Sequence, residues 1–140
     1  MRVVCVLLLI PLTACQDRAA APPAPPPVEP ATMRSGPTVP VALPRGFTVY
    51  PDARITANTL VQVDDTRRML VEFETPDPVA EVMDFYRTQA QAAEVSLTLD
   101  LGGTEAASIG GRTAAGGDFT LTARRTGPVT RAEMSFGGPR

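Results

Sequence analysis

Residues 77–93 read DPVAEVMDFYRTQAQAA, and this stretch has the clearest helical pattern in the chain. An aspartate can cap the free amides of a helix start, and proline suits the first helical position, so Asp77 and Pro78 predict where the helix begins. Apolar residues then recur at helical spacing and predict one face directed at a core, with Phe85 on its flank. The residues on this face are Val79, Val82, Met83, Tyr86, Ala90 and Ala93.

The helix face has two interpretations. Core packing is the favoured one, and it requires a partner for the Tyr86 hydroxyl if that side chain is buried. The alternative is a pocket for a small apolar ligand between the helix and a sheet, which a continuous packed core would count against. Apolar residues that could line it include Met69, Phe119 and Met134, and the chosen candidates are Phe73, Met83, Phe85 and Tyr86.

Alternating apolar residues predict a β-hairpin before the helix, because side chains of a half-buried strand point alternately to the core and to water. Residues 55–63 and 69–74 alternate in this way on either side of the turn Asp64-Asp65-Thr66. We expect the charges at this turn to be solvated rather than to form a metal or catalytic cluster. In the first strand the predicted core face consists of Ile55, Ala57, Thr59, Val61 and Val63.

Further strands are predicted after the helix. Val95, Leu97, Leu99 and Leu101 alternate most clearly, residues 119–123 and 132–136 follow, and 105–109 is a weaker candidate. The expected fold class is therefore α+β, with a five- or six-stranded antiparallel sheet, one helix packed on one face and the order β-β-α-β-β-β. A single helix covers only part of such a sheet, so we expect the sheet to curve around it or to leave apolar surface for a partner.

The sequence before this domain is rich in proline. Residues 16–45 contain nine prolines between Pro22 and Pro44, interleaved with alanine. Such a segment cannot bury enough apolar surface to fold, and it favours an extended, semi-rigid spacer. The predicted organisation is a signal peptide at 1–14, a modified cysteine and disordered linker at 15–45, and a folded domain at 46–140.

The opening of the domain, FTVYPDA at residues 47–53, predicts a turn at Pro51-Asp52. It resembles the start of many uncharacterised bacterial lipoproteins and periplasmic proteins, in which an apolar-Tyr-Pro-Gly-Ala pattern precedes a hairpin and a helix containing Phe-Tyr. The likeness covers roughly residues 47–93, and Asp52 stands where that pattern has glycine. It implies the same architecture and no particular activity.

The amino terminus carries a second resemblance. Arg2 precedes an apolar run at residues 3–10 that is too short to span a bilayer, and Pro11 ends it. Leu12-Thr13-Ala14-Cys15 then resembles the lipobox of bacterial lipoproteins. The resemblance implies that Cys15 becomes the mature amino terminus and carries the acyl chains that attach the protein to a membrane. In such lipoproteins Gln16 at the following position favours the outer membrane, facing the periplasm, over the inner membrane.

Composition excludes several function classes. From Gly46 onward there are nine arginines against thirteen acidic residues, and the chain has neither lysine nor histidine, so nucleic-acid binding is not expected. No metal or cofactor is expected, and Glu72 and Glu74 are the only acid pair considered for catalysis. We therefore expect a non-enzymatic envelope lipoprotein, either an accessory module that binds another envelope protein or a carrier of a small apolar ligand.

Overall fold

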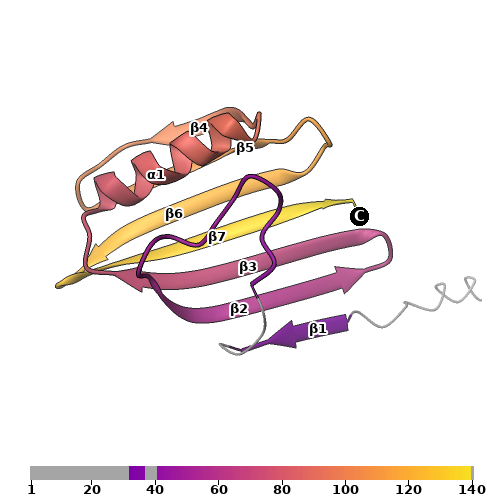
Figure 1. Ribbon diagram of the computed structural model, residues 1–140, viewed down its shortest axis with the longest axis horizontal. Helices are drawn as coiled ribbons and strands as arrows, with labels where there is room; N and C mark the ends of the chain where they lie inside the picture. The colour runs from indigo at the N-terminus through magenta and orange to yellow at the C-terminus, as the bar shows by residue number, and fades with distance from the viewer. Residues whose placement is uncertain (1–31, 37–40, 140) are drawn as a thin grey trace, which may run out of the picture.

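The computed structural model describes residues 32–36 and 41–139 (Figure 1). The predicted signal peptide and Cys15 lie outside this range. Within it, no helix has the length and hydropathy needed to cross a membrane. The elements are β1 (Thr32–Ser35), β2 (Arg54–Val63), β3 (Thr66–Thr75), α1 (Val79–Ala92), β4 (Ser96–Leu101), β5 (Ala106–Arg112), β6 (Asp118–Thr126) and β7 (Val129–Pro139).

The seven strands form one antiparallel sheet in the order β1-β2-β3-β7-β6-β5-β4. Helix α1 packs on one face of this sheet, against β4, β5 and β6 (Figure 1). Residues 41–53, the crossing segment, cover the same face beside α1, where Phe47 and Tyr50 join the core. The hydrophobic core therefore lies between the sheet and a cover made of one helix and one irregular segment.

The predicted α+β class is confirmed, with one helix on one face of an antiparallel sheet, but the predicted number of strands is too low. The weak candidate at 105–109 is a strand, β5. Strand β1 lies inside the predicted linker, where its sequence TMRS has no apolar alternation and all four residues are exposed. Backbone pairing with β2 holds it, together with a 2.9 Å hydrogen bond between the hydroxyls of Ser35 and Thr59. Val41 and Leu43 also pack on the core, ahead of the boundary predicted at residue 46.

The predicted core face of β2 is correct at Ile55 and wrong beyond it. The register with β3 shifts between Ile55 and Ala57, so one extra residue on β2 reverses the direction of every later side chain. Asn58 is consequently buried, at 1 % exposure, and Leu60 packs against the core. Val63, which the alternation placed inside, is 37 % exposed.

The leucines of β4 are also more exposed than their alternation predicts. Leu97, Leu99 and Leu101 are 37 %, 39 % and 60 % exposed, because β4 is an edge strand with a register shift after Leu97. The shift sets Asp100 on the α1 side, where its carboxylate pairs with Arg87 at 2.8 Å. A bulge and a charge on an edge strand hinder pairing with a further chain, so this edge is protected against aggregation.

The start of α1 is fixed by contacts that differ from the predicted cap. The capping position is Pro78, and the Asp77 side chain makes no capping bond. Its carboxylate instead accepts a 2.8 Å hydrogen bond from the Tyr50 hydroxyl. The Asp77 main-chain oxygen accepts two more, from the Thr130 hydroxyl at 2.6 Å and the Arg125 guanidinium at 3.0 Å. The helix therefore begins where the β6–β7 hairpin and the crossing segment hold the chain.

The predicted core face of α1 is confirmed, and the helix ends in a tight turn. After the last helical residues, the Val95 amide donates to the Ala90 carbonyl at 2.9 Å and the Glu94 amide donates to the Gln91 carbonyl at 3.1 Å. Glu94 has a φ of 55°, the left-handed backbone for which this motif favours glycine. The buried residues are Val79, Val82, Met83, Tyr86 and Ala90.

We expect Glu94→Gly to raise the free energy of unfolding by about 1 kcal/mol, because glycine adopts a positive φ without a Cβ clash and a negative charge leaves the helix C-terminus. Glu94→Ala is the matched control, since it removes the charge but keeps Cβ, and its gain should stay below about 0.5 kcal/mol. Urea denaturation measures both. Equal gains would show that the left-handed backbone carries no cost here.

Candidate functional site

The crossing segment is attached to the sheet by an aromatic contact. The Phe47 ring lies 4.8 Å from the ring centroids of both Phe119 and Phe136, which are themselves 5.3 Å apart. Aromatic pairs of this kind contribute about 0.5–1.5 kcal/mol each beyond the burial of their surface. Three rings from three different parts of the chain thus fix the middle of the crossing segment over β6 and β7.

The same segment is also bonded to α1. The Thr48 amide donates to Gln89 Oε1 at 2.9 Å, and Gln89 Nε2 donates to the Thr48 hydroxyl at 2.8 Å. Gly46 has a φ of 92°, and a Cβ there would lie 2.8 Å from the Cβ of Ala93. This close approach requires glycine, so the segment has a defined path along the helix.

The turn predicted from the YPDA sequence is present. The Ala53 amide donates to the Tyr50 carbonyl at 3.2 Å, and Asp52 has a φ of 53°. Aspartate tolerates this left-handed conformation better than most residues do. Asp52 therefore has the left-handed backbone conformation that glycine adopts easily. This explains why the pattern that residues 47–53 resemble has glycine at this position.

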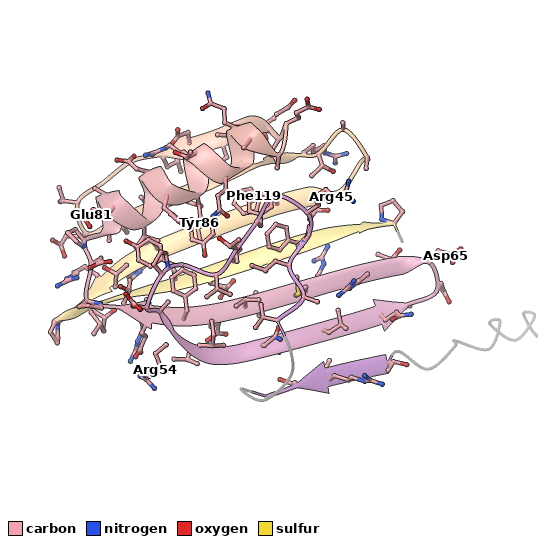
Figure 2. The ribbon with its side chains drawn as sticks, in the orientation of Figure 1. Arg45, Arg54, Asp65, Glu81, Tyr86 and Phe119 are labelled. Carbon is pink, nitrogen blue, oxygen red and sulfur yellow. The ribbon has the colours of Figure 1, made fainter. Side chains whose placement is uncertain are left out.

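Upstream of Phe47, the crossing segment borders a partly open cavity of about 550 Å³. The cavity lies where β3 begins and β7 ends, beside the β5–β6 loop. In Figure 2 this is the end of the domain marked by Asp65, and Glu81 at the start of α1 marks the other end. Its apolar wall is formed by Leu43, Pro44, Met69 and Phe136.

The floor of the cavity is partly bare backbone. Gly137 and Gly138 contribute to the lining, and a Cβ on Gly138 would lie 2.9 Å from the Cα of Gly117 in the β5–β6 loop. Arg67 also borders the cavity, two residues before Met69 and thus on the same face of β3. The arrangement suits an apolar body against Met69, with charged residues of both signs, Arg67 and Asp118, at the exposed rim.

The acidic side chains considered for chemistry lie away from this cavity. Within residues 32–36 and 41–139, no three acidic or cysteine side chains come together in a way that could hold a metal ion. Glu72 and Glu74, the acid pair considered for catalysis, do not border it. Glu72 and Glu74 point to the face of the sheet opposite the core, because they alternate along β3 with Val71 and Phe73, which are buried in the core.

The four pocket candidates lie elsewhere. Phe73, Met83 and Tyr86 are buried and Phe85 is half-buried, and the Tyr86 ring lies 6.0 Å from Phe73 and 5.1 Å from Phe85. These side chains form part of the continuous core between α1 and the sheet, and none of them lines the cavity. Met69, from the wider set of apolar residues, does line it. Sequence reasoning missed Leu43 and Phe136 as site residues.

Two tyrosines in this core differ in how their hydroxyls are satisfied. Burial, together with the hydrogen bond to Asp77, raises the pKa of Tyr50 to about 12. Burial also raises the pKa of Tyr86, which is 0 % exposed. The Tyr86 hydroxyl lies near the backbone of Tyr50, but no hydrogen bond of normal geometry joins them. The partner expected for a buried Tyr86 hydroxyl is therefore missing among the described residues.

Residues 55–125 match the START domain-like family, over just over half of the chain. The chain belongs to the START domain-like family. No curated protein and no solved structure matches it. The matched region of this START domain-like chain runs from β2 to β6 and includes Arg67 and Met69 of the cavity, whereas Leu43 and Phe136 complete the wall from outside it.

We expect Tyr50→Phe to lower the free energy of unfolding by about 1 kcal/mol, because it removes the hydrogen bond to Asp77. Tyr86→Phe should leave stability unchanged or raise it by about 1 kcal/mol, since the hydroxyl it removes is buried without a normal hydrogen bond. Urea denaturation at pH 7 compares the two. A loss for Tyr86→Phe as large as that for Tyr50→Phe would mean that the Tyr86 hydroxyl has a partner.

Proposed function

We propose that this chain is a bacterial envelope lipoprotein, anchored by lipid on Cys15, whose START domain-like domain binds one small apolar or amphipathic molecule. The observation that carries this proposal is the cavity beside the crossing segment. Its volume of about 550 Å³ falls within the range of about 300–1,000 Å³ that ligand pockets occupy. Its mostly apolar wall favours an apolar ligand, and the protein needs no catalytic group for this role.

The energetics of such a cavity depend mainly on how much apolar surface a ligand buries. Each methylene transferred from water to an apolar site contributes about 0.8 kcal/mol, which is about fourfold in affinity. Met69, at 4 % exposure, and Phe136, at 6 %, are held rigidly by the core behind them. A preformed wall loses little conformational entropy on binding, so ligand chain length should control affinity until the cavity is full.

The anchor is supported by the sequence of residues 2–16. A proline-rich spacer between Cys15 and the first described residue, Thr32, would reach about 50 Å at about 3.1 Å per residue. That reach keeps the cavity close to the membrane surface, where apolar molecules are exchanged. We place the protein in the outer membrane, facing the periplasm, because Gln16 follows the cysteine.

Straight-chain fatty acids of increasing length test the cavity. We expect binding to the full chain, measured by calorimetry, to strengthen about fourfold per added methylene and then to level off. Met69→Trp should weaken binding at least about tenfold by filling the cavity, and Leu43→Trp should act in the same direction. If the affinity of the wild-type protein does not increase with fatty-acid chain length, the site is not apolar.

The matched control is Met33→Trp, the same substitution on an edge-strand residue that is 65 % exposed and does not line the cavity. It should leave fatty-acid affinity unchanged. If Met33→Trp and Met69→Trp weaken binding equally, the ligand binds elsewhere. Circular dichroism of each variant shows that the fold is retained.

The anchor has its own test. Lipid attachment requires the Cys15 thiol, so Cys15→Ser should yield unlipidated protein, either uncleaved or soluble, with the folded domain unchanged. Wild type should follow the detergent phase, and mass spectrometry should find acyl chains on an amino-terminal Cys15. Unmodified wild-type protein in the soluble periplasmic fraction would refute the anchor and would leave the cavity proposal unaffected.

A further inference from the structure

The outer face of the sheet, the side opposite α1 and the crossing segment, carries an unusual arrangement of charge. Alternate residues of β3, β6 and β7 are buried in the core, so the residues between them point to the outer face. A partly open groove of about 520 Å³ lies mainly on this face. Its charged lining consists of Glu72, Glu74, Arg124, Arg131 and Glu133.

Two pairs of like charges lie side by side in this groove. The strand register sets Glu72 directly opposite Glu133, and Arg124 directly opposite Arg131. Like charges at directly opposed positions destabilise a sheet. The outer face of the sheet therefore contains two unfavourable charge pairs, which uncharged polar side chains at the same positions would avoid.

The remaining contacts relieve only one of these four charges. The Arg131 guanidinium donates to Glu74 at 2.7 Å and, together with the pairing of Glu74 with Arg54, lowers the pKa of that carboxyl. Within the part of the chain that the structure describes, no ion pair or hydrogen bond involves the side chains of Glu72, Glu133 or Arg124. One copy thus leaves both acids of the acidic pair, and Arg124 of the basic pair, without a partner of opposite sign.

We propose that the outer face is a self-association surface, on which a second copy of this chain docks sheet against sheet. Glu133 and Arg131 are two residues apart on β7, about 6.7 Å along the strand. Consider a two-fold axis that runs parallel to both sheets, oblique to the strands, and passes between the acidic pair and the basic pair. This axis places the acidic pair of each copy over the basic pair of the other. The face is thus complementary to itself, as a two-fold interface requires.

The area of this face is sufficient for a dimer. The strands β2, β3, β7, β6 and β5 span about 24 Å at about 4.8 Å per strand, and eight residues along a strand span about 26 Å. This gives about 600 Å² on each copy and about 1,200 Å² in total, at the lower limit of stable specific interfaces. The interface should therefore be stable but sensitive to the loss of single charge pairs.

Sedimentation equilibrium of the full chain carrying Cys15→Ser tests the proposal without acyl chains. We expect a dimer at about 100 μM, a concentration at which a Kd of about 10 μM gives mostly dimer. Glu72→Arg/Glu133→Arg leaves Glu74 as the one acidic residue in the groove's charged lining, and Arg124→Glu/Arg131→Glu makes that lining wholly acidic. Each variant alone should be monomeric, with dimerisation weakened at least about tenfold, and an equimolar mixture of the two should form a heterodimer.

The matched control is Asp65→Arg/Glu81→Arg, which changes net charge by the same amount at the two ends of the domain marked in Figure 2. It should remain dimeric. Arg124→Glu alone replaces the double variant if loss of the Arg131–Glu74 pair unfolds it, as circular dichroism will show. Monomeric wild type at about 100 μM, as expected if the groove binds a small zwitterion instead, overturns the proposal, and so does a mixture of folded variants that stays monomeric.

Discussion

The carbonyl oxygen of Asp77 accepts hydrogen bonds from Thr130 and Arg125, and the position of α1 depends on them. The Arg125 guanidinium also donates to the carbonyls of Pro76 and Pro128, so one permanently charged side chain joins the start of the helix to the turn between β6 and β7. With its first turn fixed there, α1 lies over β4, β5 and β6. The crossing segment occupies the remaining area, and the cavity forms where this segment reaches the end of the sheet.

Periodicity identified the helix, its buried face and five of the seven strands, with β5 as a weaker candidate. It misplaced the inner faces of β2 and β4, because a register shift within each strand reverses which side chains point to the core. The alternation of apolar residues in the sequence does not reveal such a shift. Strand β1 was missed because only backbone pairing with β2 and one hydroxyl contact hold it, and neither produces an apolar pattern in the sequence. The cap of α1 was misassigned because a distant residue, Tyr50, takes the Asp77 carboxylate.

The candidate site was less predictable than the fold. Sequence patterns select apolar residues, but they do not separate residues that fill a core, such as Phe73 and Tyr86, from those that border a space, such as Met69. That difference depends on whether another segment covers the side chain. Leu43, Met69 and Phe136 come from three separate parts of the chain, and only the fold brings them together. Glycines at 137 and 138, which thin the cavity floor, were the one local signal available.

Strand β1 has a mechanical consequence if the chain is held by a lipid at Cys15, as we propose. Tension between membrane and domain would then enter through Thr32, so the four-residue strand would carry the load before β2 or the core does. Its exposed side chains add little resistance beyond the backbone pairing with β2. Peeling it away would release the four residues of β1, about 13 Å of extended chain at about 3.3 Å per residue, while the cavity and α1 stay folded. The strand would act as an extensible link that protects the domain from unfolding under load.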